Sequence, residues 1–154
     1  MAPELKPTEM RAWRAFLDAQ ASLLRRLEAD LLTNEDMTLA EYDVLVQLSF
    51  APDHRLRMTE LSDRVRLSPS GLTRLVDRLV RSGLVKRGRC ASDRRGTNAI
   101  LTAAGHARLR RASPVHLRGI REHFSKHLSA KQLEAVADAL EPLGRDMPHG
   151  VSSD

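Results

Sequence analysis

The sequence predicts a mainly α-helical protein with one small β-hairpin. Apolar residues recur every three or four positions through most of the chain, as they do along the buried face of a helix. One short stretch instead places two apolar segments on either side of a polar, glycine-containing loop, which is typical of a hairpin. With 154 residues, the chain has the length of one domain with helical extensions.

The composition indicates a soluble protein of a reducing compartment. Hydrophobic residues make up 42% and charged residues 29% of the chain, and no apolar run is long enough to cross a bilayer. The segment from Met1 to Pro7 carries Glu4 and Lys6, so it does not resemble a secretory signal. The single cysteine, Cys90, can form no intrachain disulfide. We therefore expect a cytoplasmic protein that does not bind membranes.

The N-terminal half should contain two longer helices. The apolar spacing predicts the first from Trp13 to Leu32. Thr38 and Glu41 form a possible capping box for the second, which should end before Pro52.

Two short helices should follow, joined by a tight turn. The first is expected around Thr59 to Val65, and Arg66 with Leu67 makes the turn. Ser68 is a suitable N-cap for the second helix, Pro69 is a suitable first helical residue, and Gly83 should end it. This second helix should bury an apolar stripe made of Leu72, Leu75, Val76, Leu79 and Val80. Its opposite face then carries Ser70, Thr73, Arg74, Asp77 and Arg81.

A hairpin with a basic tip should come next. Leu84 and Val85 start one strand, Gly88 to Gly96 is expected as a polar loop, and Thr97 to Leu101 forms the returning strand.

The C-terminal third should again be helical. Thr102 can cap a long helix whose apolar positions extend to Leu128, and Pro114 should interrupt and bend it. Ser129 and Gln132 form a possible capping box for a final helix along Leu133, Val136, Leu140 and Leu143. The tail after Gly144 is polar and is expected to fray.

Positive charge is concentrated in the middle of the chain. The segment from Arg64 to Arg95 holds ten arginine and lysine residues and two aspartates, a net charge of +8. Because the whole chain carries +5, the remainder sums to −3. A solvated charged face usually mixes signs, so this segment favours a surface that binds a polyanion.

The order of these features predicts a helix-turn-helix with a wing. The second short helix can enter the major groove of DNA, where Ser70, Thr73 and Arg74 would reach phosphates or base edges. Arginines of the hairpin would reach phosphates or a narrow minor groove. The alternative is that these are ordinary exposed helix residues.

The sequence blocks from Leu61 to Gly105 resemble the MarR family of bacterial regulators. These blocks are LSPSGLTRLVDRL, GLVKR, SDRRG and LTAAG, in that order. The resemblance implies a transcription regulator, in particular a ligand-responsive repressor, that binds a pseudo-palindromic operator in double-stranded DNA as a homodimer. Residues 1–154 would form one domain, with a winged lobe at 38–102 and a helical dimerisation region at 10–33 and 103–145.

The resemblance also implies residue roles. Asp93 would orient neighbouring basic groups, Arg94 would contact phosphate, and Arg95 would enter the minor groove. The recognition-helix contacts would fall on Ser70, Thr73 and Arg74, with Ser68 and Arg78 beside them.

The family resemblance further suggests a small phenolic or anionic effector and no required cofactor. Trp13, Tyr42, Asp43 and Arg87 are candidate ligand-binding residues, because a urate-responsive branch of the family combines a tryptophan, an acid and an arginine. Ordinary packing or an ion pair is the alternative role.

The sequence leaves other functions open. His116, His123 and His127 recur on one predicted helical face, which is compatible with a metal site or a small metal-dependent hydrolase, but no further ligand is indicated. No HExxH, Walker loop, nucleophile elbow or dinucleotide fingerprint is present, so we expect no enzyme. Cys90 could serve as a redox-sensitive thiol near several arginines. A DNA-coating protein without sequence preference would show similar charge.

Overall fold

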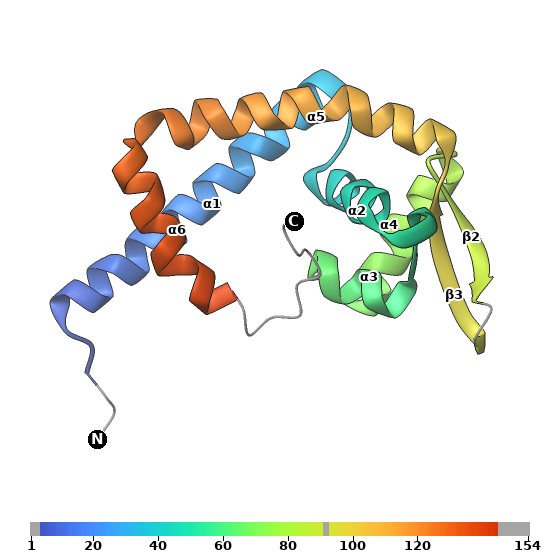
Figure 1. Ribbon diagram of the computed structural model, residues 1–154, viewed down its shortest axis with the longest axis horizontal. Helices are drawn as coiled ribbons and strands as arrows, with labels where there is room; N and C mark the ends of the chain where they lie inside the picture. Colours follow the sequence, from blue (N-terminus) through green and yellow to red (C-terminus); the bar gives the residue numbers. More distant parts are fainter. Residues whose placement is uncertain (1–3, 91–92, 145–154) are drawn as a thin grey trace.

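The fold consists of a layer of long helices joined to a compact lobe, as seen in a computed structural model that describes residues 4–90 and 93–144 (Figure 1). The helical layer contains α1 (Pro7–Glu35), α5 (Ala103–His123) and α6 (Ala130–Gly144). The winged lobe contains α2 (Leu39–Phe50), α3 (Met58–Val65), α4 (Pro69–Arg81) and a three-stranded antiparallel sheet. The predicted fold class is therefore confirmed. None of the described helices combines the length and apolar composition needed to cross a membrane.

The first helix is longer than its apolar spacing predicted. It begins at Pro7, where the Lys6 backbone N–H donates to the Glu9 carboxylate at 2.6 Å. It ends at Glu35, and Asp36 follows in the left-handed conformation with φ of 49°. The added turns carry few apolar residues, so hydrophobic periodicity could not detect them.

The long fifth helix differs from the prediction in two ways. It continues through Pro114 without interruption, so the expected break is wrong. Pro114 and Arg110 both lie on the exposed face, where water can satisfy the carbonyl that the proline leaves unpaired. The helix also ends at His123 and not near Leu128, because a 3₁₀ turn, η2 (Ser125–His127), follows.

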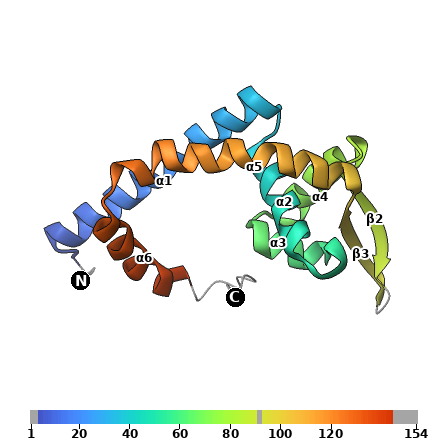
Figure 2. The same ribbon diagram turned by 45° about the horizontal axis from the view of Figure 1, so that its top comes forward.

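The sheet has the strand order β1-β3-β2, with β1 at Arg55–Arg57, β2 at Val85–Cys90 and β3 at Asp93–Leu101. The predicted loop from Gly88 to Gly96 is wrong, because Gly88 pairs with Asn98 and Arg89 pairs with Thr97. This outer part of the hairpin lacks alternating apolar residues, so the sequence pattern indicated a loop. Strand β1, which follows the 3₁₀ turn η1 (Pro52–His54), was not predicted. The hairpin projects from the lobe at the end of the molecule opposite to α6 (Figure 2).

The main core lies inside the winged lobe. It contains fully buried leucines and valines from α2, α3, α4 and the sheet, including Leu45, Leu48, Leu61, Leu72, Val76 and Val85. The expected helix caps are present: the side-chain oxygens of Thr38, Ser68, Thr102 and Ser129 accept backbone N–H bonds. By contrast, α6 has no buried residue within the single chain. The tail after Gly144 lies outside the described residues.

Candidate nucleic-acid interface

A tight turn joins α3 to α4 in the manner of a helix-turn-helix. Arg66 adopts a left-handed conformation with φ of 56°, and its backbone N–H donates to the carbonyl of Ser62. The hydroxyl of Ser62 donates to the carbonyl of Leu67 at 2.6 Å, and the side chain is almost fully buried. Ser62 thus ties the end of α3 to the turn that precedes α4, a role that sequence reasoning missed because a single serine carries no periodic signal.

Helix α4 buries one face and exposes the face that was predicted to contact DNA. Leu72, Leu75, Val76 and Leu79 are buried, whereas Ser70, Thr73 and Arg74 are exposed. Thr73 donates its hydroxyl to the carbonyl of Pro69 at 2.8 Å, which leaves the hydroxyl oxygen available as an acceptor. No hydrogen bond or ion pair joins Arg74 to another residue that the structure describes. Its guanidinium therefore has its donors available for a ligand.

Two ion pairs connect α4 to its neighbours. Arg87 of β2 lies 2.7 Å from the Asp77 carboxylate, so the base of the hairpin is held against the recognition helix. The Nε of Arg78 lies 3.6 Å from Oε1 of Glu41 on α2. Arg78, which was predicted as a DNA contact, therefore also has a partner within the chain.

The sheet adds basic side chains beside α4. Lys86 and Arg89 of β2 are exposed, as are Arg55 and Arg57 of β1. The sequence analysis did not identify Arg55 and Arg57 as part of the basic surface, because β1 has only three residues and gives no strand pattern. Asp93, Arg94 and Arg95 begin β3, but their side chains lie outside the described part of the structure, so their roles remain predictions.

A polar crevice lies between α3, α4 and the hairpin. Its volume is about 360 Å³, and its lining includes Arg57, Thr59, Thr73, Arg87 and Thr97. Guanidinium and hydroxyl groups are suited to binding phosphate oxygens. The arrangement thus provides hydrogen-bond donors on the helix, in the crevice and along the hairpin.

The four candidate ligand-binding residues do not meet within one chain. Trp13 is half-exposed beside a cavity of about 640 Å³ that is lined by α1, α6 and Arg66. Tyr42 is buried, with its ring centroid 4.5 Å from that of His116. Asp43 lines a separate cavity of about 560 Å³ between α1, α2 and α3, and Arg87 pairs with Asp77.

The environment of Asp43 favours its protonated form. The pKa of this carboxyl is raised to about 6, mainly by burial, with Arg66 opposing the shift and Glu28 adding to it. By surface area Asp43 is nevertheless an exposed residue of α2, so solvent screens this effect.

The three histidines do not share one helical face, so that expectation is wrong. His123 lies 2.8 Å from the Asp30 carboxylate, and His127 lies beyond the helix end, where its ring contacts the Glu122 carbonyl oxygen at 3.0 Å. His116 packs on Tyr42, and burial lowers its pKa. Among the described residues, no group of three or more His, Cys, Asp or Glu side chains could hold a metal ion.

The helix-turn-helix and the adjoining basic hairpin place the protein in the winged helix-turn-helix class. Residues 35–96 match the MarR family. The MarR family regulator AbsC of Streptomyces coelicolor is 34% identical, and the similarity covers 94% of this chain and 97% of AbsC with a TM-score of 0.86. This chain therefore belongs to the MarR family.

Two other relatives extend the comparison. Sco3205, a MarR family regulator of S. coelicolor solved in complex with DNA, is 31% identical over 97% of this chain and 94% of its own, with a TM-score of 0.88. The repressor YetL of Bacillus subtilis is 32% identical over 67% of this chain. That match spans 64% of YetL, which is less than two thirds of its length.

Proposed function

We propose that this protein is a sequence-specific transcriptional regulator that binds a pseudo-palindromic operator as a homodimer and represses transcription. The observation that carries the proposal is the exposed face of α4, which presents Ser70, Thr73 and Arg74 beside a basic hairpin. A helix of this kind fits the major groove, where arginine can donate two hydrogen bonds to guanine. The similarity to a regulator solved with DNA supports the same role here.

The interface would divide base recognition from phosphate binding. Arg74 would contact bases, and the hydroxyls of Ser70 and Thr73 would contact phosphates or bases, with Arg78 beside them on α4 and Ser68 at its N-cap. On the hairpin, Asp93 would orient its basic neighbours, Arg94 would contact phosphate, and Arg95 would enter the minor groove.

A second copy of the chain would cover the apolar faces of the helical layer. Trp13 and Leu24 of α1 are about half-exposed at 53% and 46%, and Leu143 of α6 is 73% exposed. Such a large unpaired apolar surface is costly in water and is typical of an interface. We therefore assign dimerisation to residues 10–33 and 103–145 and DNA binding to residues 38–102. The symmetry of such a dimer would match an operator with two inverted half-sites.

A small phenolic or anionic effector would control DNA binding without any required cofactor. The cavity between α1, α2 and α3 supports this proposal, because it lies where the helical layer meets the winged lobe. Its lining has two arginines, Arg64 and Arg66, together with two acids, Glu28 and Asp43. A ligand there would alter the angle between the two parts. Loss of operator binding on addition of a phenolic carboxylate, with no loss in an Asp43→Ala variant, would support this assignment.

The alternative is a protein that coats DNA without sequence preference. Such a protein would act in the same compartment, since both kinds bind chromosomal DNA in the cytoplasm and associate with the nucleoid. We favour the regulator because Arg74 projects from the recognition helix, where it can discriminate bases. Neither role involves catalysis.

The test is selection of bound fragments from the source genome, followed by titration of the enriched DNA and of random DNA at several salt concentrations. A specific regulator should bind its operator at least about 1,000-fold more tightly than random DNA. Affinities within a few-fold of each other on all DNAs would instead indicate a coating protein.

A further inference from the structure

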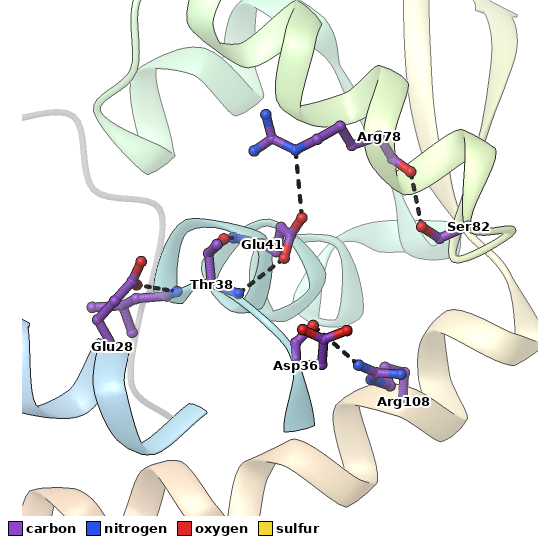
Figure 3. A network of polar contacts seen from close by, with 8 residues as sticks. Glu28, Asp36, Thr38, Glu41, Arg78, Ser82 and Arg108 are labelled. Carbon is purple, nitrogen blue, oxygen red and sulfur yellow. Dashed lines mark hydrogen bonds and ion pairs between the residues drawn. The ribbon is translucent and has the colours of Figure 1, made fainter. Parts of the chain in front are cut away.

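The turn that joins α1 to α2 is held from three sides (Figure 3). The guanidinium of Arg108 on α5 donates to the backbone carbonyls of Glu35 and Asp36. The carboxylate of Glu28 on α1 accepts the backbone N–H of Leu39 at 2.5 Å. This turn is the point where the chain passes from the helical layer into the winged lobe. The entry into the lobe is therefore anchored to two helices of the layer.

The third contact extends from the turn to the recognition helix through Glu41. Its Oε2 accepts the backbone N–H of Thr38 at 2.9 Å, as part of the cap of α2. Its Oε1 faces Nε of Arg78 on α4 at 3.6 Å (Figure 3). The Glu41 side chain is 18% exposed and that of Arg78 is 52% exposed, so solvent reaches the pair from the side of the arginine. One carboxylate thus touches both the turn and the recognition helix.

The apolar core alone would leave the orientation of α4 less well defined. Contacts among buried leucines stabilise the approach of α2 and α4, but the hydrophobic effect has no directional preference. An ion pair attracts most where its two charged groups approach each other, so the Glu41–Arg78 pair favours the orientation of α4 that keeps Nε 3.6 Å from Oε1. Because the turn before α2 is itself anchored to α1 and α5, the pair adds a restraint on the orientation of α4 relative to the helical layer.

We propose that Glu41 is a positioning residue that, by holding Arg78, sets the orientation of α4 relative to the helical layer and thereby the half-site spacing that the dimer accepts. The inference rests on the proposed function, because spacing has meaning only for a dimer that reads two half-sites. A glutamate near DNA repels phosphate, so simple electrostatics makes the opposite prediction: its loss should strengthen binding to every DNA.

The experiment uses Glu41→Gln in the full-length protein. Glutamine at this position still accepts the Thr38 N–H, so the cap of α2 is retained while the charge that holds Arg78 is removed. The matched control is Glu60→Gln, because Glu60 pairs with Arg64 inside α3 and connects no two elements. Affinities are measured for the selected operator, for operators with one base pair added or removed between half-sites, and for random DNA.

We expect Glu41→Gln to bind the operator up to about fivefold more weakly, the range of a partly exposed ion pair. It should bind random DNA no more weakly than the parent and should lose the parent's preference among spacings, whereas Glu60→Gln should keep that preference. If Glu41→Gln fails to fold, Arg78→Gln breaks the same pair from α4 without altering the cap. Because Arg78 is itself a proposed DNA contact, the deciding quantity for that variant is the ratio of its affinities among the spacings and not its absolute affinity. An unchanged spacing preference would overturn the proposal. A parent protein that shows no operator preference at all would instead refute the proposed function.

Discussion

Arg74 is the residue whose environment best separates base recognition from phosphate binding. It is exposed on α4, about a turn and a half beyond the Ser68 N-cap. Arg74→Ala should weaken operator binding by roughly 1–3 kcal/mol and relax base choice at one position in each half-site, with a smaller effect on random DNA. Titrations against single-base operator variants at several salt concentrations measure both effects.

Arg94→Ala provides the comparison. If Arg94 neutralises one phosphate, its loss should weaken binding to all DNAs nearly equally. It should also reduce the slope of log affinity against log salt concentration by about one. If Arg74→Ala also weakens binding to every DNA by the same factor, α4 does not recognise bases through that residue.

Asp43 should make stability depend on pH. Burial raises its pKa in the folded protein from 3.8 to about 6, so the folded state binds this proton more tightly than the unfolded state does. The resulting stabilisation is complete below pH 3.8 and is lost as the pH rises through 6. Asp43→Asn should therefore be more stable than the parent above pH 6, by about 1 kcal/mol or less, because the exposed edge of Asp43 is screened by solvent. Denaturant unfolding at pH 4 and pH 8 tests this, and an equal difference at both pH values would contradict it.

His116 should make the folded protein less stable as the pH falls, which is opposite to the effect of Asp43. Burial lowers its pKa below 6.5, so its contribution to stability is present above pH 6.5 and is lost as the pH falls through the lower folded-state value. Its Nδ1 is buried without a hydrogen-bond partner among the described residues, and the ring packs on Tyr42. His116→Phe keeps an aromatic ring there and cannot be protonated. We expect this variant to lose less stability than the parent between pH 7 and pH 5, as measured by thermal unfolding; parallel pH profiles would exclude this role.

At the scale of elements, the junction of α5 with the hairpin depends on a glycine. A Cβ added at Gly105 would lie 2.2 Å from the carbonyl oxygen of Leu84, which also accepts the Thr102 N–H at 3.1 Å. Gly105→Ala should therefore destabilise the fold by about 1–3 kcal/mol, because backbone must move to relieve the overlap. Gly144→Ala is the matched control, since no atom of the described residues lies within 4 Å of its added Cβ. Equal melting temperatures of the two variants would show that this contact relaxes without cost.

The helix caps explain why most elements could be predicted. Thr38 with Glu41, Ser68 before Pro69, and Thr102 each act through residues within four positions, so the local sequence contains the whole signal. The outer part of the hairpin could not be predicted in this way. Its outer residues are held by cross-strand pairing, such as Arg89 with Thr97, and that pairing leaves no apolar pattern in either strand alone.

At the scale of the whole molecule, the exposed apolar faces of α1 and α6 should decide the oligomeric state. Leu140 lies beside Phe16 in the grooves between these helices. Leu140→Glu should convert a dimer into monomers, because a charge buried in an apolar interface is strongly unfavourable. Operator affinity should fall with it, since a monomer contacts one half-site. Sedimentation at micromolar concentration provides the measurement.

The control for that experiment is Phe50→Glu. Phe50 is 75% exposed but lies at the end of α2, outside the helical layer. It should leave the dimer intact. A parent protein that sediments as a monomer, or a Leu140→Glu variant that remains dimeric, would refute the assigned interface.

The sequence by itself determined the helices, the turn before α4, the exposed face of that helix and the concentration of positive charge beside it. Each of these follows from local spacing, capping or composition, which act over a few residues. Only the tertiary structure decided which charges meet. The pairs Asp77 with Arg87, Glu41 with Arg78, and Asp30 with His123 join residues that are 10 to 93 positions apart. The packing of the buried core brings these residues together, and no local pattern in the sequence encodes their distance.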